Sequence, residues 1–329
     1  MENPGITSYN VSASPHIKDS SSTSDIMRDV LIAMLPTTVY GIWQFGLNSL
    51  IVVVLTVATA VLAEYLYQKF MKKPGTIRDL SAAVTGLILA LNMPPEIPVW
   101  IPMLGAVFAI IVVKQFYGGI GQNWMNPALA ARCFLLISFA LRMTNFTSKR
   151  LGYDSLSGAT PLAAQKQAAD AISSATAGAA SGGYTLMNMF IGRIPGTIGE
   201  VSKIALLIGA AYLLYKKVIS LRIPLAYILT VIVFTFVFGN HTLTFVMGHL
   251  LGGGLIFGAF FMATDYTTTP ITPSGQIIYG ICVGILTSLF RMFGGSAEGV
   301  SYAIIIGNIL YPLIEKMTIP KPFGRRAKA

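Results

Sequence analysis

A segment that ends at Thr160 reads DSLSGAT and places a hydroxyl group where a second protein could approach it closely. Gly158 leaves the backbone conformationally free, and Ala159 adds little bulk beside the hydroxyl. Ser157 and Asp154 stand upstream, and the Asp154 carboxylate could orient the segment, or help to hold a metal ion, while a group is attached to Thr160. By itself such a string is also typical of an ordinary polar loop.

Asp265 is a second residue that could carry chemistry. It follows an apolar run interrupted by glycines and precedes three threonines and a proline. An ionisable side chain within the membrane is rare and usually has a functional role. Hard cations such as Na+ prefer carboxylate, hydroxyl and carbonyl oxygens, and this segment offers all three. The alternative is that Asp265 caps a short turn at the cytoplasmic surface, and both interpretations stay open.

Asn126-Pro127-Ala128 is predicted to begin a helix, with Asn as the cap and Pro at the first helical position. The positive end of this helix dipole could instead face a cofactor or an ion path. The same tripeptide occurs twice in aquaporins, and its single copy here argues against a water channel.

Other ionisable residues give weaker signals. Glu64, Glu200, Glu298 and Glu315 fall near predicted helix ends, where capping or snorkelling explains them. No His, Asp or Glu spacing predicts a zinc site, and no Cys spacing predicts an iron–sulfur cluster. The two cysteines lie far apart in apolar segments, which predicts buried free thiols. A Gly-rich dinucleotide loop is also absent, so nicotinamide or iron–sulfur chemistry would belong to other subunits.

The elements that must position these residues are membrane helices. The chain is 54% hydrophobic and 11% charged over 329 residues, whereas a soluble domain is about a quarter charged. The net charge of +10 predicts cytoplasmic loops rich in Lys and Arg and not a nucleic-acid surface, because no basic run is interleaved with aromatic residues. A cleavable signal peptide is not predicted.

Apolar runs near 20 residues predict spanning helices. Ten such runs occur, at about 30–46, 48–68, 81–93, 98–114, 126–142, 200–215, 223–239, 244–262, 276–292 and 299–315. The third run is too short to span fully, because prolines follow it, and glycines interrupt the eighth. Interrupted segments in matching positions of two halves indicate a functional centre at mid-membrane.

The two halves look related, because FYGG precedes the fifth run and MFGG precedes the tenth. Five helices in each half would make the second half inverted relative to the first. The predicted fold class is therefore an all-α polytopic membrane protein with about ten transmembrane helices in two inverted five-helix repeats. The predicted parts are a polar tail (1–25), a first repeat (26–142), a loop (143–199), a second repeat (200–316) and a basic tail (317–329).

The charge distribution predicts how the chain is oriented in the membrane, because most Lys and Arg residues fall in segments on the same side of the membrane as the N-terminus. Both termini are then predicted to be cytoplasmic, and the 143–199 loop with Thr160 extracytoplasmic. A loop of this length tends to be functional or disordered. The end of the loop holds Met187, Met189, Phe190 and Ile191, which could cover a flavin ring or merely lie on the membrane surface.

The DSLSGAT segment resembles the flavin-attachment motif Asp-x-x-Ser/Thr-Gly-Ala-Thr/Ser of membrane flavoproteins in the Rnf and Na+-pumping NADH:quinone reductase complexes. Four further segments resemble the same NqrB/RnfD family, namely 28–33 (RDVLIA), 118–132, 194–200 (IPGTIGE) and 262–270 (MATDYTTTP). The chain is similar to this family along nearly its whole length, and most similar to its Rnf members.

The resemblance implies a fold similar to urea transporters and FMN joined to Thr160 as a phosphoester by a flavin transferase. It implies a flavoprotein subunit of an ion-translocating ferredoxin:NAD+ oxidoreductase in the cell membrane. Such a subunit would relay electrons, would couple them to Na+ or H+ transport, and would not be catalytic alone. Its expected partners are the lipid bilayer and the C, G, E, A and B subunits of the Rnf complex. A second, non-covalent flavin among the helices is conceivable by the same resemblance.

Two alternatives remain from the sequence. One is a non-redox transporter or channel for a small polar solute, which would have no use for the motif that ends at Thr160. The other is NqrB itself, which usually carries a longer polar N-terminus. A covalently held, fluorescent flavin separates the redox interpretation from the transporter.

Overall fold

The computed structural model describes residues 22–146, 160, 162–163, 185–239, 241–294 and 299–320. Within these residues every regular element is a helix. The first half forms α1 (Thr23–Phe45), α2 (Leu47–Phe70), η1 (Ile77–Asp79), α3 (Ser81–Leu91), α4 (Trp100–Val107), η2 (Phe108–Gln115), α5 (Pro127–Ser138) and α6 (Ala140–Met143). The second half forms α8 (Leu186–Ile191), α9 (Lys203–Tyr215), α10 (Arg222–Phe238), α11 (Leu243–Leu251), α12 (Leu255–Phe257), η3 (Gly258–Met262), α13 (Pro273–Phe293) and α14 (Val300–Thr318).

Each of the ten predicted apolar runs coincides with a helix or with consecutive helices. By length and composition, three described helices can cross a membrane, namely α2, α13 and α14. The pair of α11 with α12–η3 would be a fourth span, bent by 61°. Five further apolar helices of 10–17 residues are α3, α4–η2, α5, α9 and α10. The fold is that of an all-α polytopic membrane protein, and the number of ten spans stays a prediction.

Local chemistry explains where these helices begin and break. The Ser22 hydroxyl and the Asp25 carboxylate form a capping box at the start of α1. The third run ends as predicted, since α3 stops at Leu91, shortly before two prolines. The fifth run is not one helix, because the backbone leaves the helical region at Phe139 (φ −131°) between α5 and α6. The eighth run breaks between Leu251 and Leu255, with Gly253 at φ +61°.

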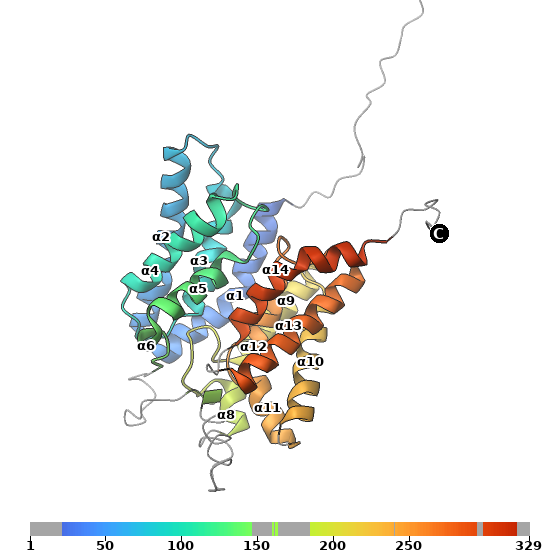
Figure 1. The fold of residues 1–329 in the computed structure, drawn as a ribbon. Helices are drawn as coiled ribbons and strands as arrows, with labels where there is room; N and C mark the ends of the chain where they lie inside the picture. The colour runs from blue at the N-terminus through green and yellow to red at the C-terminus, as the bar shows by residue number, and fades with distance from the viewer. Residues whose placement is uncertain are drawn as a thin grey trace, which may run out of the picture.

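The two halves lie side by side and repeat one pattern of packing (Figure 1). In the first half α2 packs against α3 and α4, and in the second half α10 packs against α11 and α13. Between the halves α1 packs against α9, and α5 packs against α14. The start of α1 and the end of α14 lie toward the same end of the molecule in Figure 1, whereas α8 lies at the opposite end.

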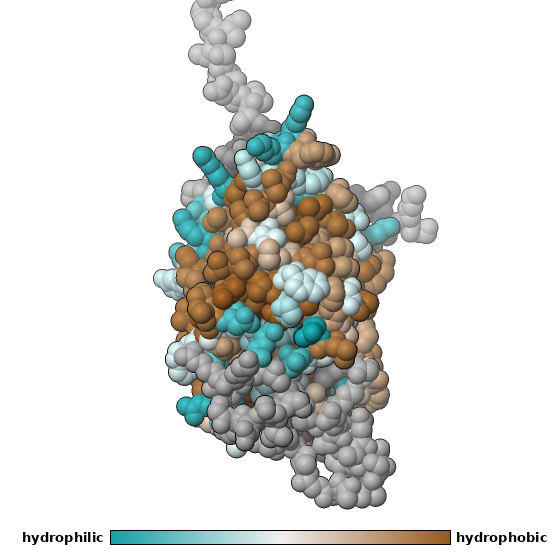
Figure 2. All heavy atoms as spheres, turned by 90° about the vertical axis from the view of Figure 1, so that its left-hand side faces the viewer, coloured by the Kyte–Doolittle hydropathy of each residue, from teal (hydrophilic) through white to brown (hydrophobic). Residues whose placement is uncertain are grey.

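Apolar side chains cover the outside of the helices. Figure 2 shows one side of the molecule, where they form a broad face with hydrophilic side chains toward its upper and lower ends. The exposed apolar side chains of α2 include Leu47, Val54, Leu62, Leu66 and Phe70. A soluble monomer rarely exposes so large an apolar face, so this surface fits contact with lipid.

Glycines allow the helices of the two halves to approach closely. A Cβ at Gly209 of α9 would overlap the backbone carbonyl of Ala33 in α1. Small residues at such contacts are common in membrane proteins, where van der Waals packing drives helix association.

Gly209→Ala should therefore lower the stability of the protein by about 1–3 kcal/mol, because α1 and α9 must move apart to admit the methyl group. The measurement is the thermal unfolding midpoint in detergent micelles. Gly75→Ala is the matched control, because nothing lies within 4 Å of a Cβ at Gly75. Equal midpoints for the two variants would contradict the expected overlap.

Candidate functional site

Thr160 lies inside the protein. It is 6% exposed, and Leu162 is 2% exposed. The Thr160 Oγ1 atom accepts a hydrogen bond of 3.3 Å from the backbone N–H of Ala163. The other residues of the predicted attachment motif, Asp154, Ser157, Gly158 and Ala159, lie outside the described residues.

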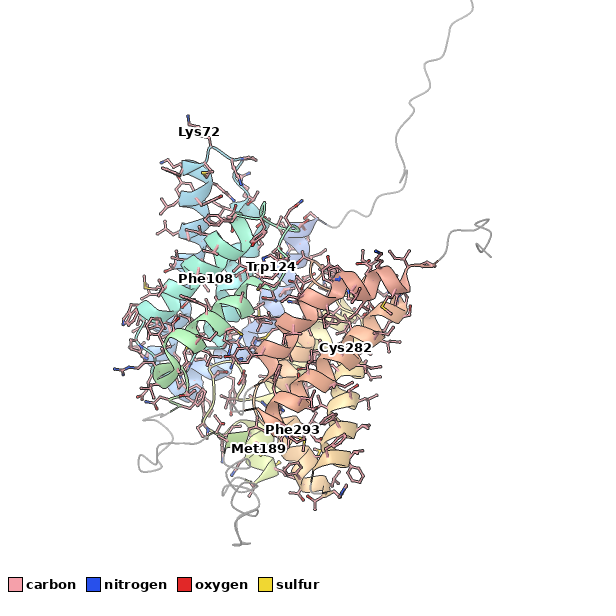
Figure 3. The ribbon with its side chains drawn as sticks, viewed as in Figure 1. Lys72, Phe108, Trp124, Met189, Cys282 and Phe293 are labelled. Carbon is pink, nitrogen blue, oxygen red and sulfur yellow. The ribbon has the colours of Figure 1, made fainter. Side chains whose placement is uncertain are left out.

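Leu162 packs against the break between α11 and α12. A Cβ placed at Gly252 would lie 3.6 Å from Leu162 Cβ, and one at Gly253 would lie 3.6 Å from Leu162 Cδ2. Met189 of α8 is also buried, whereas Met187 is 64% exposed. Met189 and Phe293 both lie toward the lower end of the molecule in Figure 3, and Lys72 lies at the upper end. Of the apolar residues predicted to cover a flavin, Met189 is thus turned inward and Met187 is not.

Two buried cations hold the backbone of the break. Arg291 donates from Nη1 to the carbonyl of His249 and from Nη2 to that of Gly252, the latter at 3.2 Å. Lys203 donates from Nζ to the carbonyl of Gly253 at 3.0 Å and to the carbonyl of Glu200. The last carbonyls of a helix have no partner within it and carry partial negative charge, so both cations are favourably placed.

Glu200 and Arg132 form a buried ion pair beside the same break, with 3.4 Å between Oε1 and Nη1. Arg132 Nη1 also donates to Asn92 Oδ1 at 2.8 Å and to Ser301 Oγ at 2.9 Å. The Glu200 carboxylate lies so close to Gly254 that a Cβ there would overlap it. One guanidinium therefore joins the end of α3, the segment before α9 and the start of α14.

The segment that carries Glu200 is itself fixed to α3. Ile198 N–H donates to the carbonyl of Met93 at 3.0 Å, and Gly199 N–H donates to that of Leu91 at 2.7 Å. These bonds satisfy carbonyls at the end of a short helix that stops inside the protein.

Asn126 and Asp265, which are far apart in sequence, line one cavity of about 100 Å³. Asn126 caps α5 as predicted, because its Oδ1 accepts from the N–H groups of Ala128 and Leu129 at 3.1 and 3.4 Å. The cavity wall also includes Lys114, Thr85 and the aromatic rings of Phe260 and Phe261. This position is compatible with both predicted roles of Asn126, as a helix cap and as the helix end that faces a cofactor or an ion path.

Asp265 is half-buried and bonded within its own turn. Its Oδ1 accepts from Thr267 N–H at 3.4 Å, and its Oδ2 accepts from Thr267 Oγ1 at 3.2 Å and from Thr268 Oγ1 at 3.4 Å. Burial raises the pKa of this carboxyl above its ordinary value, while the hydrogen bonds from Thr267 and Thr268 lower it. Asn123 Nδ2 donates to Thr267 Oγ1 at 3.1 Å and ties the turn to the segment before α5.

A second buried ion pair lies beside this cavity. Lys114 Nζ is 2.8 Å from Glu64 Oε2 and also donates to Ser81 Oγ at 2.6 Å. Gln115 donates to Glu64 Oε1 at 2.9 Å. Lys114 and Gln115 are consecutive residues of η2, which is wound as a π-helix, and such turns are frequent at functional sites.

The expectation that Glu64 and Glu200 only cap helices or snorkel is therefore wrong. They are 0% and 3% exposed, and each is paired with a cation. Glu315 is half-buried, and Glu298 lies outside the described residues. Arg132 stands in the middle of an apolar run, and such a position is a sequence signal for a functional or paired cation.

Among the described residues no group of three or more His, Cys, Asp and Glu side chains could hold a metal ion. A monovalent cation at Asp265 would have to take its remaining ligands from hydroxyl and carbonyl oxygens.

Replacing Glu64 by Leu should destabilise the protein by about 3 kcal/mol or more, because it leaves the Lys114 ammonium buried without its carboxylate. The thermal unfolding midpoint in detergent reports the loss. Glu64→Leu combined with Lys114→Met should recover part of it, which a double-mutant cycle measures. Arg28→Gln is the control, because the Asp25–Arg28 pair is exposed to solvent and its loss should not be measurable. Additive effects of the two buried substitutions would contradict the pairing.

Comparison with known proteins matches the family described as NQR2, RnfD, RnfE over residues 10–324. The D subunit of the Na+-translocating ferredoxin:NAD+ oxidoreductase complex of Acetobacterium woodii is 45% identical over 316 residues, which cover 95% of each chain. The D subunit of the proton-translocating ferredoxin:NAD+ oxidoreductase complex of Clostridium ljungdahlii is 41% identical and covers 97% of each chain. The D subunit of the ion-translocating oxidoreductase complex of Escherichia coli is 34% identical over 97% of this chain and 99% of its own length.

Proposed function

This chain belongs to the NQR2, RnfD, RnfE family, and from that premise we propose that it is the flavin-carrying membrane subunit of an ion-translocating ferredoxin:NAD+ oxidoreductase. The names of its relatives support this complex, since two are D subunits of ion-translocating ferredoxin:NAD+ oxidoreductase complexes and a third is the D subunit of an ion-translocating oxidoreductase complex. The chain would work together with the C, G, E, A and B subunits of the Rnf complex and would not be catalytic alone.

The proposed cofactor is FMN joined to Thr160 by a flavin transferase. The observation that carries this proposal is that Thr160, which ends the attachment pattern, is buried, and that Leu162 two residues later packs against a broken helix held by cationic side chains. The charge of these residues suits the group, because Arg291 and Lys203 are cations beside the break and a cation complements a phosphate. Bound FMN would supply one- and two-electron redox chemistry.

The residues of the chain would anchor and surround that group. Thr160 would provide the tether, and Leu162 would hold the tether against the break. Met189 would exclude water from the apolar side of the ring, because its side chain is buried in α8. Asp154, Ser157, Gly158 and Ala159 would serve recognition by the transferase.

Thr160→Ala should abolish covalent flavin, because no hydroxyl is left to form the phosphoester. The full chain is co-expressed with a flavin transferase, and intact mass and in-gel flavin fluorescence are measured. Thr160→Ser is the matched control and should keep the added mass of FMN less water. An unmodified wild-type chain beside an active transferase would refute the flavin role and would favour the non-redox transporter.

The proposed ion site is Asp265 at the cavity shared with Asn126. Support comes from a half-buried carboxylate that faces hydroxyl groups of Thr267 and Thr268 at the end of a broken helix. The relatives are named for Na+ and for protons, so either ion is compatible with this family. A second, non-covalent flavin among the helices stays a prediction.

Asp265→Asn should reduce ion uptake while electron transfer from ferredoxin to NAD+ continues, because the neutral amide no longer attracts a cation. Inverted membrane vesicles containing the complete complex allow ion uptake per NADH formed to be measured. Glu315→Gln is the control, since Glu315 lies near the exposed end of α14. An unchanged ratio for Asp265→Asn would exclude this carboxylate from the ion path.

The proposed setting is the cell membrane, with ten spans in two inverted repeats, both termini cytoplasmic and Thr160 on the outer side. The repeated packing of α2 and α10 within their halves supports the repeats. The placement of α8 opposite the start of α1 and the end of α14 supports the orientation (Figure 1).

A further inference from the structure

The end of α2 and the loop after it form a strongly positive surface, which we call the basic end of α2. It consists of four exposed cations, namely Lys69, Lys72, Lys73 and Arg78. No Asp or Glu occurs between Glu64 and Asp79, and among the described residues no carboxylate forms an ion pair with any of the four cations. The end of a helix carries about half of one negative charge, so most of this positive charge is left without compensation.

The backbone holds two of these lysines in defined positions. Lys73 N–H donates to the carbonyl of Gln68 at 2.9 Å, and Lys72 N–H donates to that of Lys69 at 3.4 Å. These two bonds form the Schellman motif, in which glycine usually takes the left-handed position. Lys72 occupies that position here, at φ +53°. The turn therefore places a charged side chain where the backbone would favour glycine.

Aromatic and apolar side chains lie among these cations. Lys69 Nζ is 5.8 Å from the centroid of the Tyr65 ring. Lys73 Nζ is 5.3 Å from the centroid of the Tyr67 ring. Phe70, between the two lysines, is 85% exposed. Tyr is enriched where a membrane meets water, so this composition is typical of the headgroup region of a bilayer.

The length of α2 leads to the same depth. Its 24 residues extend over about 36 Å, whereas the hydrocarbon core of a bilayer is roughly 30 Å thick. If the exposed apolar side chains of α2 contact lipid tails, the last turn reaches the headgroups. Lys72 lies at the upper end of the molecule in Figure 3, and hydrophilic side chains lie above the broad apolar face in Figure 2.

We propose that the basic end of α2 binds an anionic phospholipid, with the phosphate of the headgroup facing Lys72 and Lys73 and the acyl chains lying along the apolar side of α2. Charge complementarity carries this inference, because clusters of Lys and Arg directly after a membrane helix attract anionic headgroups. A phospholipid also supplies the apolar contact that Phe70 and the exposed side chains below it require. The inference does not depend on a flavin at Thr160 or an ion at Asp265.

The test uses the full chain purified in a neutral detergent. It is titrated with dioleoyl phosphatidylglycerol and, separately, with dioleoyl phosphatidylcholine, and bound lipid is counted by native mass spectrometry. The wild-type chain should bind phosphatidylglycerol more tightly. Lys72→Gln combined with Lys73→Gln should weaken phosphatidylglycerol binding about tenfold or more and leave phosphatidylcholine binding unchanged. Lys72→Arg combined with Lys73→Arg keeps both charges and should keep the preference.

Lys216→Gln combined with Lys217→Gln is the matched control. These two lysines are also consecutive and exposed at a helix end, and Lys217 has the same left-handed conformation, at φ +55°. Their charge is offset nearby, since Lys216 Nζ lies 5.9 Å from the ring of Tyr212, whose hydroxyl donates to the Asp29 carboxylate at 2.9 Å. The control should therefore lose little of the preference for phosphatidylglycerol.

Equal affinity of the wild-type chain for the two lipids would overturn the inference. Equal losses in the two double Gln variants would also overturn it, because they would indicate a general attraction to positive charge. In the complete complex, loss of another subunit from the Lys72→Gln and Lys73→Gln variant with unchanged lipid binding would assign this surface to a protein partner instead. All substituted side chains are exposed, and an unchanged thermal unfolding midpoint verifies that each variant is folded.

Discussion

The contact between Arg132 and Glu200 is the interaction on which the arrangement of the two halves depends. Arg132 belongs to α5 of the first half, and Glu200 precedes α9 of the second. The same guanidinium also reaches Asn92 at the end of α3 and Ser301 in α14. A buried charge left without its partner is costly, so these four elements are constrained to meet at one point.

The broken helix connects the two candidate sites. Gly254 at its start lies against Glu200, and Phe260 and Phe261 near its end line the cavity that holds Asp265. The eight residues from Leu255 to Met262 cover roughly 12 Å. A displacement at the break beside Glu200 would therefore reach the cavity of Asp265 through one short helical segment.

Much of the fold was predictable, because apolar runs, prolines and glycines act locally. The short third helix, the broken eighth run and the cap at Asn126 follow from neighbouring residues. The pairing of Glu64 with Lys114 and of Glu200 with Arg132 was not predicted, because partners 50 and 68 residues apart meet only in the folded protein. Counting charges gives only an orientation, whereas the position of Lys114 at the end of an apolar run and of Arg132 inside one is the sequence signal for these pairs. The shared cavity of Asn126 and Asp265 also depends on tertiary packing.

The burial of Thr160 has a consequence for how the protein matures. A hydroxyl that is 6% exposed, in a segment whose Leu162 is packed against a helix break, cannot enter the active site of another enzyme as it stands. Attachment of a flavin at this position must therefore come before the segment closes over the break, or it must exploit an opening of that segment. In the first case biogenesis has a fixed order, with the cofactor installed before the native packing is completed around it.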